Sequence, residues 1–122
     1  MNRKILLIDD DESISEVIQI FLEEQGYKVK SYVDGLDIVG KINKAKPGII
    51  LLDYLLPGKN GVEIAREIRK KLSARKLPLI MIAANTIYKE ESQTVGIDAF
   101  LEKPFDLYEL LKIVKHYLKS TN

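Results

Sequence analysis

The sequence predicts an α/β fold, in which helices cover both faces of a doubly wound, five-stranded parallel sheet. Segments of strand length, which are apolar runs or alternate apolar and polar residues, recur five times, and a predicted helix follows each of them. This alternation of strand and helix indicates parallel strands that are joined by right-handed crossovers. The chain shows no linker, internal repeat or low-complexity segment, so we expect residues 1–122 to form a single domain.

The first predicted strand is the run KILLI at 4–8, which is too short for a helix. Ser13 and Glu16 match a capping box, which predicts that a helix starts there, and Gly26 is placed to end it. Residues 27–32, YKVKSY, alternate apolar and polar side chains, which is typical of a half-buried strand near the edge of a sheet.

The middle of the chain repeats the pattern. A short helix is predicted from Asp34 to the residues before Pro47. The run GIILLD at 48–53 is the most apolar strand, which favours a central place in the sheet. A turn at 57–61 then leads into an amphipathic helix over 62–72.

Two further strand and helix pairs complete the prediction. Residues 78–84, PLIMIAA, form a buried strand, and a weaker helix over 87–95 ends at Gly96. Residues 99–103 form a short last strand, and a strong amphipathic helix covers 105–118.

The composition excludes several classes of protein. Lys and Arg number 19 and Asp and Glu number 18, and a net charge of +1 gives no reason to expect direct binding of nucleic acid. The absence of cysteine excludes disulfides, thiolate catalysis and cysteine metal sites. No apolar run reaches the length of a membrane span, and no signal peptide precedes the first strand. We therefore expect a cytoplasmic protein with no direct contact to a membrane.

Charged side chains follow three of the predicted strands. Asp9 and Asp10 come directly after the first strand, Asp53 ends the third, and Lys103 ends the fifth. Any one of these residues alone reads as a solvated loop charge or a helix cap. Because ligands of such sheets bind at the carboxyl ends of the strands, the combination predicts that these groups share one site.

Three neighbouring carboxylates cannot all stay ionised at low cost without a cation. Oxygen ligands without histidine suit Mg²⁺ better than zinc, and Lys103 would supply a further positive charge. Such a set of groups matches phosphoryl transfer, where catalysis is mostly positioning and charge neutralisation. Asp11 and Glu12 lie where a helix begins, so we interpret them as mainly structural.

The chain resembles the receiver domains of two-component response regulators from end to end. The residues that carry this resemblance are the acidic pair Asp9 and Asp10, the block LLDYLLPGKNG around Asp53, and KPF at 103–105. The resemblance implies a flavodoxin-like strand order, 2-1-3-4-5. It also implies a phosphoacceptor signalling protein that is not an enzyme on other substrates, although it can catalyse its own phosphorylation and dephosphorylation.

The resemblance implies a role for each site residue. Asp53 would be the phosphoacceptor, forming an acyl phosphate. Asp10 would bind Mg²⁺ directly, Asp9 mainly through water, and Leu55 through its main-chain carbonyl. Lys103 would contact the phosphoryl oxygens. By the same resemblance, a cis peptide bond would precede Pro104, and Gly61 would permit a tight turn below the site.

The resemblance also implies the partners. The phosphoryl donor would be a histidine kinase or a histidine phosphotransferase, and the output would be a downstream protein target. Strand five and the last helix would form the output face or a dimer interface. The first helix has more apolar residues than one buried stripe needs, with Ile14, Val17 and Phe21 on one face and Ile18 and Leu22 beside it. The extra residues either pack at the edges of the core or dock the donor.

One position departs from the family pattern. Receiver domains usually place Ser or Thr where this chain has Ala83, so a hydroxyl that bonds the phosphoryl group is missing. Either the backbone N–H of Ala84 still holds the phosphoryl oxygen and only fine control is lost, or the small Ala83 lets Phe100 sit inward without phosphate. Leu55, two residues after Asp53, would hinder an attacking water, which predicts slow self-dephosphorylation.

Two alternatives remain open from the sequence. A pseudo-receiver, an interaction module with weakened switching, would fit Ala83 but not the intact acids and lysine. A Mg²⁺-dependent phosphatase of the haloacid-dehalogenase type would use Asp53 as nucleophile. That class usually has a second acid where this chain has Leu55, and it needs a cap for which 122 residues leave little room.

Overall fold

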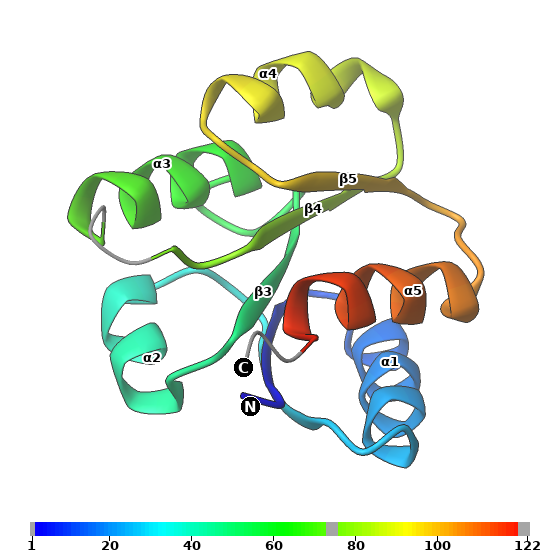
Figure 1. Cartoon of the computed structure of the whole chain (residues 1–122). Coiled ribbons are helices and arrows are strands. Elements are labelled where there is room, and N and C mark those ends of the chain that lie inside the picture. Colours follow the sequence, from blue (N-terminus) through cyan, green and yellow to red (C-terminus); the bar gives the residue numbers. More distant parts are fainter. Residues whose placement is uncertain (1, 73–75, 120–122) are drawn as a thin grey trace.

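The computed structural model describes residues 2–72 and 76–119 (Figure 1). Among these residues, parallel strands form one sheet in the order β2-β1-β3-β4-β5. The strands are β1 (Lys4–Ile8), β2 (Lys28–Tyr32), β3 (Ile49–Asp53), β4 (Leu79–Ala83) and β5 (Ala99–Glu102). The predicted α/β fold, its doubly wound sheet and its flavodoxin-like strand order are confirmed.

Helices cover both faces of this sheet. Helices α1 and α5 lie on one face, and α2, α3 and α4 lie on the other (Figure 1). Their bounds are α1 (Glu12–Glu24), α2 (Ile38–Ala45), α3 (Gly61–Lys71), the 3-10 turn η1 (Thr86–Tyr88), α4 (Lys89–Thr94) and α5 (Leu107–Leu118). Within the described residues, no helix combines the length and the apolar character that a membrane span requires.

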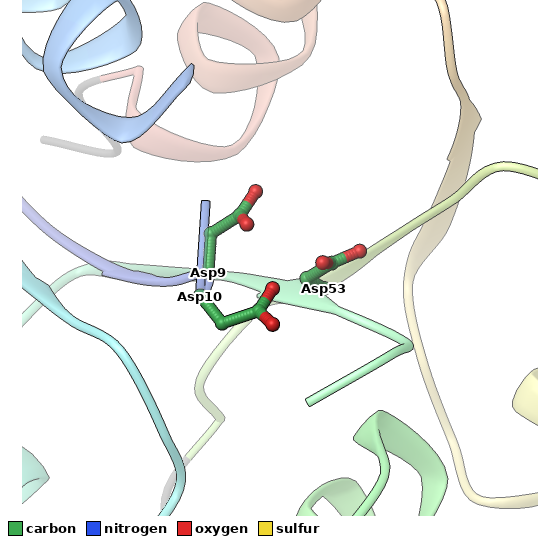
Figure 2. Close-up of side chains that lie close together, drawn as sticks. All are labelled: Asp9, Asp10 and Asp53. Carbon is green, nitrogen blue, oxygen red and sulfur yellow. The ribbon is translucent and has the colours of Figure 1, made fainter. Parts of the chain in front are cut away.

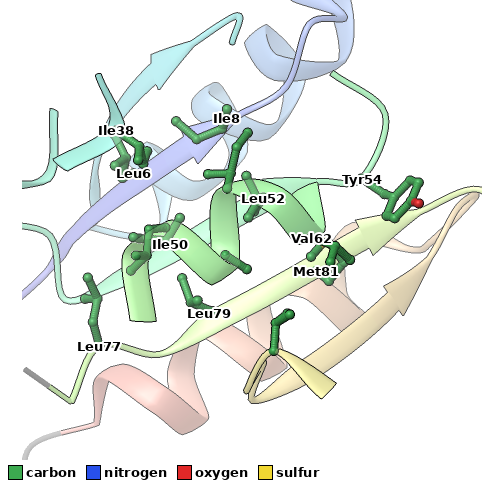
Figure 3. Packing of buried hydrophobic residues seen from close by; sticks show 14 of the residues in the cluster. Leu6, Ile8, Ile38, Ile50, Leu52, Tyr54, Val62, Leu77, Leu79 and Met81 are labelled. Atoms are coloured by element: carbon green, nitrogen blue, oxygen red, sulfur yellow. The ribbon is translucent and has the colours of Figure 1, made fainter. Parts of the chain in front are cut away.

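Each face of the sheet has its own core. In β1, Leu6 points into the core under α2 and α3, whereas Leu7 points into the core under α1 and α5. Figure 3 shows the first of these cores, where Leu6 lies with Ile50 and Leu52 of β3. All five residues of β3 are buried, which is why its sequence is almost continuously apolar.

The start of α1 differs from the prediction. The helix begins at Glu12, and the carboxylate of Asp11 caps it by accepting a hydrogen bond from the backbone N–H of Ile14, at 3.1 Å. The predicted capping box of Ser13 and Glu16 is therefore wrong, because Asp11, another residue type that caps helices well, lies two positions earlier and caps this one. The structural role that was predicted for Asp11 is confirmed.

The start of α2 also differs. Asp37 caps this helix through the backbone N–H of Gly40. Asp34, predicted to start it, instead accepts a hydrogen bond from the N–H of Leu36 and pairs with the ammonium of Lys41 at 3.1 Å. The shift in the helix start follows from having two aspartates that can both cap.

The first helix buries fewer apolar residues than it carries. Ile18 and Leu22 are buried in the core, and Phe21 packs beside it. Ile14 and Val17 are 37% and 54% exposed. The interpretation that the extra apolar residues pack at the edges of the core is therefore wrong for Ile14 and Val17.

Candidate functional site

Three carboxylates meet beyond the ends of β1 and β3. Because these strands pair in parallel with Ile8 opposite Leu52, the residues that follow them lie side by side. Asp9, Asp10 and Asp53 each offer a carboxylate oxygen, and these oxygens lie within 4.8 Å of one another (Figure 2). Asp9 and Asp53 are buried, whereas Asp10 is exposed.

Lys103 brings the positive charge that the sequence predicted. Its backbone N–H donates to the carbonyl of Ala83, which places the residue just past the end of β5. The Lys103 ammonium lies 3.3 Å from Oδ1 of Asp53 and 3.4 Å from Oδ2 of Asp9. The peptide bond between Lys103 and Pro104 is cis, as predicted. The structure thus brings together the four charged groups that the strand ends indicated.

Asp9 also ties the site to α1. Its Oδ1 accepts a hydrogen bond from the backbone N–H of Asp11 at 2.9 Å, and its carbonyl accepts one from the Ser15 hydroxyl at 3.4 Å. One carboxylate therefore binds both the loop that starts the helix and the Lys103 ammonium, which fixes its orientation.

Burial and neighbouring charges shift the pKa values of Asp53 and Lys103. Burial, and then the negative charge of Asp9, raise the pKa of Asp53 to about 6, although Lys103 acts in the opposite direction. Burial alone would lower the pKa of Lys103, but the charges of Asp53 and Asp9 outweigh it and raise that pKa. At neutral pH the Asp53 carboxyl is therefore mostly ionised, and among the described side chains the Lys103 ammonium is the cation that pairs with it.

A hard cation fits this donor set. Mg²⁺ binds oxygen at about 2.1 Å, so two ligands on opposite sides of the ion lie about 4.2 Å apart. Carboxylate oxygens spread over 4.8 Å can therefore share one ion if at least one of them acts through water or moves slightly. The chemistry of the donors, which are all carboxylates, favours magnesium over zinc.

Comparison with known proteins decides the family. The sequence model of the response regulator receiver domain matches residues 5–115. The chain belongs to the response regulator receiver domain family. Its acidic pocket is typical of the phosphoacceptor domains of two-component systems.

Several solved structures are similar to this receiver domain. The chemotaxis protein CheY4 of Vibrio cholerae is 30% identical with a TM-score of 0.87, and the match covers 97% of this chain and 100% of that one. The response regulator TrrA of Thermotoga maritima, in complex with Mg²⁺-BeF, is 31% identical with a TM-score of 0.85 over 95% and 99% of the two chains. A receiver domain of a Pseudomonas aeruginosa sensor histidine kinase is 31% identical, with a TM-score of 0.87 over 98% and 100%. It has a magnesium ion coordinated in its active site cleft.

Gly61 has a different role from the predicted one. It is the first residue of α3, and its N–H donates to the carbonyl of Tyr54 at 2.7 Å. A Cβ on this residue would lie 2.7 Å from the carbonyl oxygen of Asp53 and 2.7 Å from the sulfur of Met81. Glycine is needed here because α3 approaches the end of β3 closely, whereas the positive φ in this loop belongs to Gly58.

The residues around the missing hydroxyl are placed as follows. Ala83 is buried at the end of β4, and Phe100 is half-buried against the core cluster that contains Ala83. Ala84 is exposed next to Lys103. The side chain of Leu55 is 59% exposed, just after β3. The roles assigned to the Leu55 carbonyl, the Ala84 N–H and Phe100 remain predictions.

A groove of about 640 Å³ runs beside the charged pocket, between α1 and the loop that joins β5 to α5. Its lining is largely apolar and includes Ile14, Val17, Lys103, Phe105 and Leu107. The exposed Ile14 and Val17 of α1 therefore border a concave surface that reaches Lys103.

An aromatic contact next to the site gave no signal in the sequence. The rings of Tyr54 and Tyr88 stack with centroids 3.9 Å apart and an interplanar angle of 16°. The Tyr54 hydroxyl donates to Oε1 of Glu91 at 3.0 Å. Tyr54 directly follows β3, Tyr88 ends η1 and Glu91 lies in α4, and only the tertiary fold brings the three residues together.

Proposed function

We propose that this receiver domain is a phosphoacceptor, in which Asp53 takes a phosphoryl group from the phosphohistidine of a histidine kinase or histidine phosphotransferase. The observation that supports this most is the pocket that unites the buried Asp53 carboxylate with Asp9, Asp10 and the Lys103 ammonium. In this proposal, residues 1–122 form a single domain of a cytoplasmic protein. The domain does not catalyse reactions of other substrates.

The chemistry is a transfer between nucleophiles. A carboxylate oxygen of Asp53 attacks phosphorus, the phosphorus–nitrogen bond of the donor breaks, and the histidine nitrogen keeps the electron pair and takes up a proton. With its pKa at about 6, Asp53 is ionised and nucleophilic at neutral pH. Lys103, 3.3 Å from Asp53, is placed to donate hydrogen bonds to the incoming phosphoryl oxygens.

Asp10 and Asp53 would hold Mg²⁺ directly, with Asp9 acting through water and Leu55 through its carbonyl. When bound, the ion neutralises negative charge on the phosphoryl oxygens. The fit of the carboxylates and the magnesium in the Thermotoga maritima and Pseudomonas aeruginosa structures support this assignment. The Ala84 N–H would hold one phosphoryl oxygen in the place of the missing hydroxyl.

The donor would dock on the groove between α1 and the β5–α5 loop. A phosphohistidine protein presents a helix, and the exposed Ile14 and Val17 offer an apolar surface for it beside Lys103. The output face, which would bind a downstream protein or a second copy of the chain, would lie on β5 and α5.

Incubation with Mg²⁺ and acetyl phosphate, followed by intact mass measurement, tests the proposal. We expect a single phosphoryl adduct that is absent in Asp53→Ala. Continuous release of phosphate without an adduct would instead indicate a Mg²⁺-dependent phosphatase. Absence of an adduct from both acetyl phosphate and a phosphohistidine donor would indicate the pseudo-receiver, the alternative that Ala83 favours.

A further inference from the structure

We propose that Tyr54 is a positioning residue that latches η1 and α4 to the phosphoacceptor strand, and that this latch must be released when Asp53 is loaded with a phosphoryl group. The proposal rests on the proposed function of Asp53. It assigns to this chain a coupling between the site and α4 that passes through Tyr54, Tyr88 and Glu91, since Ala83 has no hydroxyl to provide one.

The latch has two contacts. The stacked rings of Tyr54 and Tyr88 hold η1, and the hydrogen bond from the Tyr54 hydroxyl to Glu91 holds α4. Tyr54 is only 8% exposed. Its pKa is raised, first by burial and then by the hydrogen bond to Glu91, so the hydroxyl remains a donor at neutral pH.

The Tyr54 side of the latch is fixed. Its backbone N–H donates to the carbonyl of Ile82 at 2.8 Å, and its carbonyl accepts from Gly61 at 2.7 Å. Tyr54 is therefore fastened to both β4 and α3, immediately after Asp53. Any relative movement must occur on the side of Tyr88 and α4.

The α4 side forms a connected unit. The buried Ser92 of α4 donates its hydroxyl to the carbonyl of Tyr88 at 2.6 Å. The side chain of Asn85 turns back onto its own loop and accepts from the N–H of Ile87 at 2.9 Å. Residues 85–94 are therefore joined from the end of β4 through η1 to α4, and the latch restrains them together.

The loop after Ala83 makes contacts within itself and with Tyr54. Among the described side chains, the positive partner of the Asp53 carboxylate is Lys103, and the side-chain oxygen of Asn85 accepts a hydrogen bond within its own loop. We expect the loop after Ala83 to move relative to Tyr54 when it contacts a phosphoryl group on Asp53. The stack and the hydrogen bond oppose that movement, so they favour the state without the phosphoryl group.

Two conservative variants test the latch from its two ends. Tyr54→Phe keeps the ring stack and removes the hydroxyl, and Glu91→Gln weakens the acceptor on α4. In metal-free protein, we expect hydrogen exchange of the backbone amides of residues 88–94 to accelerate by about tenfold in both, as for the loss of one hydrogen bond to a charged group. Glu90→Gln, on the same helix without a described side-chain partner, is the matched control. Exchange as slow as in the wild type would overturn the latch.

The second measurement is the affinity for beryllofluoride in the presence of Mg²⁺. Because coupling is reciprocal, weakening the latch must tighten binding at Asp53, by about five- to tenfold, in Tyr54→Phe and in Glu91→Gln alike. A role limited to anchoring α4 would leave this affinity unchanged. An affinity that is unchanged or weaker in either variant would overturn the proposal.

The two proposals fail in different ways. If wild-type protein binds no beryllofluoride and takes no phosphoryl group from acetyl phosphate, the proposed function is wrong, and the coupling to Asp53 falls with it. If wild-type protein binds beryllofluoride and both latch variants bind it with the same affinity as the wild type, only the latch is wrong.

Discussion

Burial and the neighbouring carboxylates give the ionisation of Asp53 an electrostatic cost in the folded protein. Asp53 lies 6% exposed beside two other carboxylates, with one ammonium to offset them. The raised pKa records that cost, because it means that the folded chain resists ionisation of this group. Such a site gains stability from any cation that reaches it, which is what a magnesium and phosphoryl site requires.

The raised pKa predicts a pH-dependent stability difference in metal-free protein. The pKa of Asp53 rises from 3.8 to about 6 on folding, so its contribution to stability is fully present below the lower value and is lost as pH rises through the higher one. We expect Asp53→Asn to unfold with a free energy higher than wild type by on the order of 1–3 kcal/mol at neutral pH, measured by urea denaturation with a chelator present.

The difference should shrink as pH falls through about 6 and be smallest below 3.8, where Asp53 is protonated in both the folded and the unfolded wild type. Added Mg²⁺ should stabilise the wild type and reduce the advantage of Asp53→Asn, since the ion binds only the folded site. A stability difference that is independent of both pH and Mg²⁺ would contradict this account of Asp53.

Leu55 carries a prediction about the lifetime of the phosphoryl group. Its exposed apolar side chain follows Asp53 by two residues, where it would hinder the approach of an attacking water. We expect Leu55→Asn to lose the phosphoryl group several-fold faster than wild type, measured by the decay of radiolabel after the donor is removed. Faster decay in the wild type than in the variant would rule out this role.

At the scale of the element, a substitution on α1 should distinguish docking of the protein donor from the chemistry at Asp53. Val17 borders the groove but makes no described contact with Asp53, so its substitution should affect the protein donor alone. We expect Val17→Glu to slow phosphotransfer from a phosphohistidine protein by at least about tenfold, since a charge would enter an apolar interface. The rate with acetyl phosphate should match the wild type. Equal slowing with both donors would show that α1 does not dock the donor.

Secondary structure could be predicted where one signal dominated. The strands were found because β1, β3 and β4 are short, mostly buried apolar runs and because β2 alternates apolar and polar residues. The prediction placed β3 at the centre because it is apolar on both faces. Helix starts were predicted less well where several capping residues compete. Asp11 outcompetes Ser13, and Asp37 caps α2 because Asp34 pairs with Lys41.

At the scale of the whole molecule, the parallel topology explains why the charged site could be predicted. Residues that follow the strands of one parallel sheet meet at one edge, so the positions of Asp9, Asp53 and Lys103 follow from the alternation of strands and helices. The stack of Tyr54 on Tyr88 could not be predicted in this way. It depends on how the loop after β4 folds back, which no local pattern specifies.

Chemical trapping of the acyl phosphate would identify the residue that accepts the phosphoryl group. After exposure to Mg²⁺ and acetyl phosphate, borohydride reduces an aspartyl phosphate to homoserine, and peptide mass mapping locates the change. We predict conversion at Asp53 and at no other acid, with no conversion when Mg²⁺ is chelated. Conversion at Asp9 or Asp10, or none at Asp53 in the presence of Mg²⁺ and donor, would contradict the claim that this pocket exists to phosphorylate Asp53.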